Sequence, residues 1–271
     1  MLDAYADRWA LVTGASSGIG AAFAQRLAAR GMHLILTARR RERMEELAKD
    51  LDTRHGTKSA IIVADLSDPT APKQLFDEVK SRGNTIELLV NNAGFGFVGE
   101  VSDTDVDHML RMTRLNIGAT IDLTYRILPG MLDRGHGAII NVSSLAGFQP
   151  VAYMPVYAST KAFVLHFSEA LWAETRERDV TVMALCPGTV ATEFFGIAGV
   201  AGWLKKRRSH TPNQVVKSAL KALDKKRQYI VPGWRNYLLS LSIRLARRKM
   251  VVRQSMQFFR PKRKKDDAKE A

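Results

Sequence analysis

The sequence has a single cysteine, Cys186, among its 271 residues. A lone cysteine cannot form an intramolecular disulfide, so the chain gives no sign of an oxidising compartment. It also lacks any run of the ~18 uninterrupted apolar residues that a membrane-spanning helix needs. Its first residues carry acidic side chains where a secretory signal would carry basic ones, and no apolar run among them is long enough for such a signal. These absences lead us to expect a soluble, cytoplasmic protein.

Charge is unevenly distributed along the chain, and acidic residues are scarce in its last quarter. The sequence contains 41 Lys and Arg against 27 Asp and Glu, a net charge of +14. Residues 203–271 hold 21 of the basic residues and only 4 of the acidic ones, which leaves 20 basic and 23 acidic residues before them. The main body is therefore slightly acidic, and only the C-terminal part needs an explanation for its positive charge.

The C-terminal part combines this charge with apolar side chains. From Trp234 to Phe259, aliphatic and aromatic residues are interleaved with arginine and lysine, and a basic run at 260–265 follows. We predict that 234–271 is a basic amphipathic extension whose residues 234–265 make peripheral contact with an anionic membrane. Packing against a partner subunit and a disordered basic end are the alternatives. No nucleic-acid partner is expected, because the run lacks aromatic stacking positions and a known reading fold.

A glycine-rich segment near the N-terminus has the form of a phosphate-binding loop. The apolar run 8–12 leads into Thr13-Gly14-Ala15-Ser16-Ser17-Gly18-Ile19-Gly20, and helical periodicity follows from 21 to 30. Glycines let the backbone turn tightly and approach a pyrophosphate, which then lies against the free N–H groups at the start of the helix. The order of strand, glycine loop and helix therefore predicts a dinucleotide site.

The second apolar run, 32–38, ends without the acidic residue that binds a ribose 2′-hydroxyl in many dinucleotide sites. Ala38 stands at that position, and Arg39-Arg40-Arg41 follows. Arginine at this place suits a 2′-phosphate. We therefore favour NADP(H) over NAD(H) and assign Arg39 to the cofactor. The alternative is that arginines 39–43 open a solvated helix.

Short apolar runs alternate with helical stretches along the body. The runs span residues 8–12, 32–38, 59–64, 86–90, 138–142, 180–185 and 228–232. The pattern predicts βαβ units, so we expect 1–233 to form one doubly wound (Rossmann) α/β domain. Its parallel sheet should have about seven strands with helices on both faces. Asp65 and Asn91 fall at carboxyl ends of strands, where such folds bind ligands.

Tyr157 and Lys161 are four residues apart, so on a helix their side chains project from one face. A neighbouring ammonium favours the phenolate and lowers the pKa of the phenol toward the operating range, which suits a general acid or base. Ser144 follows the apolar run 138–142, and its hydroxyl could hold a carbonyl oxygen beside Tyr157. For the Tyr–Lys pair taken alone, a solvated helix face is the alternative.

Taken together, the motifs resemble the short-chain dehydrogenase/reductase family. The matching segments are TGASSGIG at 13–20, Asp65-Leu66, NNAG at 91–94, Asn116, Ser144, YASTK at 157–161 and Pro187-Gly188. Tyr157 lies 13 residues after Ser144, and Ser144 lies 28 after Asn116, as the family pattern requires. The resemblance covers roughly residues 8–192.

The resemblance implies roles for individual residues. Tyr157 would be the general acid or base, Lys161 would tune its pKa, and Ser144 would orient the substrate oxygen. Asn116 would complete a proton relay. The cofactor-binding residues expected from the motifs and the resemblance are Gly14, Ser16, Ser17, Gly18, Ile19, Gly20, Arg39, Asp65, Leu66, Asn91, Ala93, Gly94, Tyr157, Lys161, Pro187, Gly188, Val190 and Thr192. No metal site is expected, and the resemblance suggests a homodimer or homotetramer.

Residues 193–211 fall where the family places a variable substrate lid. Its apolar residues Phe194, Phe195, Ile197, Val200, Trp203 and Leu204 would line an apolar space. Phe194 and Phe195 are candidate substrate contacts beside Ser144 and Tyr157. We therefore expect an NADP(H)-dependent oxidoreductase that interconverts a carbonyl and an alcohol on a lipophilic ketone, aldehyde or acyl-type substrate. The alternatives are a lid that only packs on the core, and a non-catalytic dinucleotide-binding scaffold or sensor.

Overall fold

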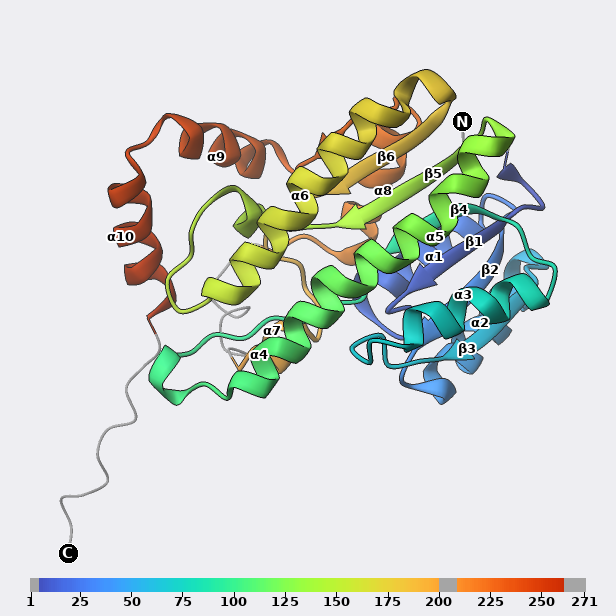
Figure 1. The fold of residues 1–271 in the computed structure, drawn as a ribbon, viewed down its shortest axis with the longest axis horizontal. Helices are drawn as coiled ribbons and strands as arrows, with labels where there is room; N and C mark the ends of the chain where they lie inside the picture. Colours follow the sequence, from blue (N-terminus) through green and yellow to red (C-terminus); the bar gives the residue numbers. More distant parts are fainter. Residues whose placement is uncertain (1–4, 200–208, 261–271) are drawn as a thin grey trace, which may run out of the picture.

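The computed structural model describes residues 5–199 and 209–260, and its centre is a parallel sheet (Figure 1). Within these residues the sheet has seven strands in the order β3-β2-β1-β4-β5-β6-β7. The strands are β1 (Trp9–Thr13), β2 (His33–Ala38), β3 (Ser59–Val63), β4 (Ile86–Asn91), β5 (Gly137–Val142), β6 (Val180–Leu185) and β7 (Tyr229–Ile230). The predicted doubly wound fold with seven strands is therefore confirmed.

Helices cover both faces of the sheet, because successive side chains of each strand point to opposite faces. Ala10 and Val12 of β1 pack against one set of helices, whereas Leu11 packs against the other. The first set is α1 (Gly18–Ala28), α2 (Arg41–His55) and α8 (Pro212–Leu223). The second set, which crosses the sheet in Figure 1, is α3 (Ala71–Ser81), α5 (Ala119–Arg134) and α6 (Pro155–Thr175).

Residues 106–134 form one helical stretch with an irregular turn inside it. α4 (Val106–Thr113) continues through a π-helical turn, Arg114–Gly118, into α5. Such π turns insert an extra residue and are frequent at functional sites. Asn116 lies in the middle of this turn and is 1% exposed.

The chain reverses its direction of winding between β1 and β4, which are neighbours at the centre of the sheet. Strand order runs outward from β1 to β3 on one side and from β4 to β7 on the other. The loops after β1 and β4 therefore separate at their carboxyl ends and leave a crevice there, the place where doubly wound folds bind ligands.

The C-terminal part forms two helices, α9 (Trp234–Leu245) and α10 (Arg248–Phe259), where the sequence analysis predicted amphipathic structure. They lie at the end of the molecule away from β2 and β3 and meet at a sharp corner (Figure 1). The Ser255 hydroxyl of α10 accepts a hydrogen bond of 3.1 Å from the Ala152 N–H, which ties α10 to the segment before α6. Among the described residues, none of the helices is both long and apolar enough to pass through a lipid bilayer.

Candidate active site

A cavity of about 800 Å³ opens at the carboxyl ends of β1, β4, β5 and β6. Most residues predicted for the site line it: Gly14, Ser16, Ser17, Gly18, Ile19, Arg39, Asp65, Leu66, Ala93, Gly94, Ser144, Tyr157, Lys161, Pro187, Gly188, Val190, Thr192 and Phe194. The sequence motifs, which lie far apart along the chain, thus meet in one space.

The glycine loop after β1 has a backbone that other residues could not adopt without strain. Gly14 has φ +66° and Gly18 has φ +57°, both in the left-handed region that favours glycine. Gly20 does not line the cavity; a Cβ there would collide with the carbonyl oxygen of Gly14. Gly20 therefore serves the close packing of the loop on the start of α1.

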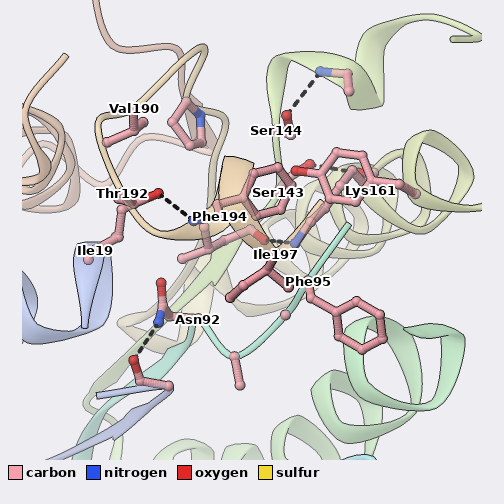
Figure 2. Close-up of a pocket in the computed structure, with 18 of the residues that line it drawn as sticks. Ile19, Asn92, Phe95, Ser143, Ser144, Lys161, Val190, Thr192, Phe194 and Ile197 are labelled. Atoms are coloured by element: carbon pink, nitrogen blue, oxygen red, sulfur yellow. Dashed lines mark hydrogen bonds between the residues drawn. The ribbon is translucent and has the colours of Figure 1, made fainter. Parts of the chain in front are cut away.

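Asn92, the residue after the predicted Asn91, holds this loop. Its Nδ2 donates to the carbonyl of Thr13 at 2.8 Å and to that of Gly14 at 3.3 Å (Figure 2). Asn91 does not line the cavity, because its Nδ2 points into the core and donates to Thr124 and Asn141. Side chains alternate along β4, so at its last residue, Asn91, the side chain faces the core, and the contact predicted for Asn91 with the cofactor stays a prediction.

Arg40 makes the contacts with the glycine loop that the sequence analysis did not foresee. Its Nη2 donates to the hydroxyls of Ser16 at 3.1 Å and Ser17 at 2.8 Å, and its Nη1 donates to Glu193 at 2.8 Å. Arg43 donates to the other oxygen of Glu193 at 2.6 Å. These hydrogen bonds, from Arg43 first and then Arg40, lower the pKa of Glu193 to about 2.

The predicted Arg39 lies at the edge of the cavity beside Asp65. Its Nη1 is 3.9 Å from the Asp65 carboxylate, and its side chain is 70% exposed. Burial raises the pKa of Asp65, but hydrogen bonds from Ser67 and the charge of Arg39 outweigh burial and hold the pKa below its usual value. Asp65 is therefore a charged acceptor at the wall formed by the loop after β3.

The two serines after β5 have different surroundings. Ser143 is 2% exposed, and its hydroxyl donates to the Lys161 carbonyl at 2.6 Å, which fixes the end of β5 against α6. The Ser144 hydroxyl lines the cavity and accepts from the Ala146 N–H at 3.1 Å (Figure 2). Ser144, which was predicted from the sequence, is also the serine whose hydroxyl hydrogen-bonds Tyr157.

Tyr157 and Lys161 lie one turn apart on α6, as their spacing predicts. The Lys161 Nζ is 5.8 Å from the centre of the Tyr157 ring and donates to the Val142 carbonyl at 2.8 Å. Burial raises the pKa of Tyr157 to about 12, against a lowering effect of the Ser144 hydrogen bond. Burial also lowers the pKa of Lys161 to about 8.

The shift of Tyr157 is opposite to the lowering that its lysine neighbour predicts. Burial disfavours a buried phenolate more strongly than the hydrogen bond of Ser144 favours it. Burial likewise disfavours the ammonium of Lys161, so the cation that should favour the phenolate is itself easier to neutralise. The phenol is therefore held in its protonated form at neutral pH.

Asn116 lies directly behind the cavity wall. Its Oδ1 accepts from the Phe95 N–H at 3.2 Å, and its Nδ2 donates to the Phe95 carbonyl at 3.0 Å and to Thr160 Oγ1 at 3.1 Å. A Cβ on Gly94 would lie 2.9 Å from Asn116 Oδ1 and 3.5 Å from Lys161 Nζ, which places the amide near the lysine. Asn116 itself does not line the cavity.

Apolar side chains close the other end of the cavity. The Phe194 ring of α7 (Phe194–Ile197) packs against Tyr157 with ring centres 5.3 Å apart. A Cβ on Gly96 would lie 2.6 Å from the Phe194 ring and 3.0 Å from the Tyr157 ring, so glycine makes this approach possible. Met154 of the segment before α6 and Val251 and Phe259 of α10 continue the apolar wall.

Only part of the predicted lid can be compared with the prediction. Val200, Trp203 and Leu204 lie outside the described residues, and the side chain of Phe195 is likewise not described. The segments on either side of this gap are anchored, because Val190 and His210 form a parallel bridge and Glu193 is bound to α2. Residues of α9 and α10 also line the cavity. Apart from the apolar character of these helices, nothing in the sequence indicated this.

Residues 8–198 match the family model of short chain dehydrogenase. The chain belongs to the short-chain dehydrogenase family. It is 35% identical over 196 residues to the very-long-chain 3-oxoacyl-CoA reductase of Anas platyrhynchos, covering 70% of this chain and 62% of the duck protein. This short-chain dehydrogenase thus matches less than two thirds of that relative's length.

Solved structures give the same assignment. A short-chain dehydrogenase from Sphingobium yanoikuyae in complex with NADPH superimposes with a TM-score of 0.81 at 30% identity, over 96% of this chain and 99% of that one. The bulky-bulky ketone specific alcohol dehydrogenase of Comamonas testosteroni gives 0.76 at 29% identity, over 88% and 92% of the two chains. Both neighbours are dehydrogenases, and the first of them is in complex with NADPH, a nicotinamide dinucleotide.

The residues at the polar end of the cavity fit such a cofactor. The Gly14 and Gly18 backbone leaves the loop free of side chains at the start of α1, where helix N–H groups favour phosphate. The Asp65 carboxylate and the Leu66 side chain line the same end. The Arg40 guanidinium adds a positive charge beside Ser16 and Ser17.

Proposed function

We propose that the protein is an NADP(H)-dependent reductase that converts a lipophilic ketone, aldehyde or acyl-type carbonyl to an alcohol. One observation carries the proposal: Tyr157 lies between the Ser144 hydroxyl and the Lys161 ammonium, at the junction of the polar and apolar ends of the cavity. An acid placed there reaches a carbonyl in the apolar part while a dinucleotide occupies the polar part.

The chain supplies the proton and the geometry of the reaction. The nicotinamide, when bound, supplies a hydride to the carbonyl carbon. Ser144 orients the carbonyl oxygen, and Tyr157 donates its phenolic proton to that oxygen, leaving a phenolate. The positive charge of Lys161 stabilises the phenolate. A phenol with a pKa of about 12 stays protonated at neutral pH, which suits the reductive direction.

Asn116 has two roles in this proposal. It holds the backbone on both sides of Phe95 and binds Thr160, one residue before Lys161. Because Phe95 belongs to the loop after β4 and Thr160 to α6, the amide of Asn116 fixes this loop against α6. We assign it the end of the proton relay that reprotonates Tyr157 through Lys161 after each turnover.

The preference for NADP(H) rests on arginine rather than on an acidic residue at the end of β2. The guanidinium of Arg40 faces the glycine loop, so a 2′-phosphate on the neighbouring ribose would meet a positive charge there. Arg39 lies on the other side, beside Asp65. The NADPH complex of the Sphingobium yanoikuyae enzyme supports this choice.

The apolar end of the cavity supports a lipophilic substrate. Phe194, Val251 and Phe259 surround the space next to Tyr157, and a charged substrate would lose its hydration there without a partner. The duck relative acts on very-long-chain 3-oxoacyl-CoA, and the Comamonas testosteroni relative on bulky-bulky ketones. Both favour an extended or bulky carbonyl compound over a small polar one.

A panel of carbonyl compounds tests the proposal directly. NADPH oxidation is followed by absorbance with ketones and 3-oxoacyl thioesters of increasing chain length, and kcat/KM should rise with length. Tyr157→Phe should reduce turnover by about 10²–10⁴-fold, because the general acid is lost. NADPH affinity, measured by fluorescence titration, should stay within about threefold, a difference well under 1.4 kcal/mol.

The rival function, a dinucleotide-binding scaffold or sensor, predicts a different outcome. It requires tight NADPH binding with no turnover of any compound in the panel, and equal behaviour of wild type and Tyr157→Phe. Turnover confined to small polar ketones would instead retain the enzyme and remove the lipophilic substrate.

A further inference from the structure

α9 and α10 are attached to the body by one face each. Ser240 of α9 and Val251 and Ser255 of α10 are buried, and Ser255 accepts a hydrogen bond from Ala152. A Cβ on Gly188 would lie 2.6 Å from Nδ2 of Asn236, which shows how closely α9 approaches the loop after β6. The two helices are thus fixed beside the cavity.

Their opposite faces expose large apolar side chains. Leu245 is 90% exposed, Trp234 is 69% exposed and Leu238 is 53% exposed, all on α9. On α10, Met250 and Met256 are also exposed. Scattered apolar residues are normal on a protein surface, but such a concentration on two adjoining helices marks an interaction site.

The same helices carry positive charge and no negative charge. The sequence has no aspartate or glutamate between Asp224 and Asp266. Exposed bases accompany the apolar residues: Arg235, Arg244, Arg247, Arg248, Lys249, Arg253 and Arg260. An apolar surface with cations and without carboxylates has the composition of helices that lie in the interface of an anionic membrane.

Charge distinguishes the membrane from the other occupants of such a surface. A second copy placed on this face would bring two unscreened sets of arginines together, which opposes association. A nucleic acid would satisfy the charges but would leave Leu245 and Leu238 against a polar backbone. An anionic bilayer satisfies both, because its phosphates pair with arginine and its acyl region accepts the apolar side chains.

The surface is continuous with the cavity. Leu239 of α9 and Phe258 of α10 are each about half exposed and also line the cavity. An apolar molecule that leaves the bilayer at this rim would meet Phe259 and Val251, which also line the cavity, before Phe194 beside Tyr157.

We propose that α9 and α10 dock the protein on an anionic lipid surface and open the cavity toward it, so that substrate enters from the membrane. The docking stands on the exposed residues alone, whereas the entry of substrate rests on the proposed function. Trp234 and Leu245 belong to the docking surface and not to the cavity lining, which lets the two parts be tested separately.

Co-sedimentation of the full chain with vesicles tests the docking. Wild type should bind phosphatidylcholine vesicles containing phosphatidylglycerol at least tenfold more tightly than pure phosphatidylcholine vesicles. The double variant Trp234→Ser, Leu245→Ser should lose about tenfold in binding to the anionic vesicles. The matched control is Val101→Ser, Val106→Ser, two exposed apolar residues on the body, and it should bind as wild type does.

Three outcomes overturn the docking. The docking is refuted if the wild-type protein stays in solution when anionic vesicles sediment. It is also refuted if both double variants lose vesicle binding to the same extent. A surface variant that binds vesicles normally but lowers the apparent mass of the protein in solution assigns the face to a second copy instead. Circular dichroism and NADPH affinity, which should match wild type in both double variants, exclude misfolding as the cause.

Activity measurements test the entry of substrate from the membrane separately from the docking. With a long-chain ketone held in anionic vesicles, the surface variant should lose about tenfold in rate, while its rate on a short water-soluble ketone should equal wild type. Equal rates on the vesicle-held ketone would refute entry from the membrane. Vesicle binding without activity on any ketone would refute the proposed function and leave the docking supported.

Discussion

Arg40 and Glu193, which are 153 residues apart in the sequence, form an ion pair of 2.8 Å across the mouth of the cavity. The same guanidinium donates to Ser16 and Ser17 of the glycine loop. One arginine therefore connects the proposed cofactor site with the residue that begins the predicted lid. A 2′-phosphate that binds Arg40 must share it with a carboxylate that is already there.

Glu193→Gln should raise the affinity for NADPH by about 2- to 10-fold and leave the affinity for NADH nearly unchanged, since partly exposed ion pairs contribute modestly. The reason is that the neutral amide no longer repels a 2′-phosphate or holds the charge of Arg40. Fluorescence titration with both cofactors measures the effect. Glu46→Gln, an exposed neighbour on α2, is the control. Weaker NADPH binding would mean that Glu193 positions Arg40 for the phosphate.

Arg40→Ala should weaken NADPH binding by about 10- to 100-fold, the cost of losing hydrogen bonds to a charged group. The effect on NADH should be small, because NADH lacks the phosphate. Arg39→Ala should change the preference less, because its side chain is 70% exposed and faces Asp65 at 3.9 Å. The reverse ranking of the two variants would return the phosphate to Arg39.

The rate of carbonyl reduction should fall as pH rises through about 8. The pKa of Lys161 is lowered to about 8 by burial, so its positive charge is present below that pH and lost above it. Tyr157 stays protonated across the same range because its pKa is about 12. The phenolate left after proton donation then loses its stabilising cation, and kcat/KM should decline about tenfold per pH unit.

Lys161→Arg supplies the control for this profile, because a guanidinium keeps its charge throughout the measured range. Whatever its maximal rate, the variant should show no decline near pH 8. A wild-type profile that stays flat up to pH 10 would contradict the role of the Lys161 charge.

Glu87 should matter for stability and not for catalysis. Its side chain is 1% exposed at the end of β4 away from the cavity, and its carboxylate lies 2.7 Å from His136 and 3.5 Å from Arg134. Glu87→Gln should lower the free energy of unfolding by about 1–3 kcal/mol, because it breaks a buried charged interaction. Denaturant unfolding measures the change. Asp77→Asn, from an exposed pair with Lys73, should have little effect, and a large loss of kcat/KM in Glu87→Gln would contradict the separation.

The fold was predictable because short, mostly apolar strands alternate with helical stretches along the chain. β4 and β5 are buried along their whole length, and apart from Glu87, Asn91 and Asn141 their residues are apolar, which is typical of parallel strands covered on both faces. Tyr157 and Lys161 were predictable for a similar reason, since helical spacing alone brings them to one face. Local periodicity and short motifs therefore located both the sheet and the proposed acid.

Contacts between segments far apart were not predictable. The pairing of Glu193 with Arg40 and Arg43 depends on how the segment after β6 lies against the start of α2, which no local pattern encodes. Which of Asn91 and Asn92 faces the glycine loop depends on a shift of one residue at the end of β4, because neighbouring side chains point to opposite faces. The pKa of Tyr157 depends on burial, which the spacing of Tyr157 and Lys161 does not reveal.

Glu193 and Phe194 are consecutive residues that hold the start of the predicted lid by different forces. Glu193 is held by charge, which added salt screens, and Phe194 by apolar packing on Tyr157, which weakens on cooling. Opening this segment should thus become easier in high salt and also in the cold. If opening of this segment limits product release, turnover should fall less on cooling than the rate of the chemical step does.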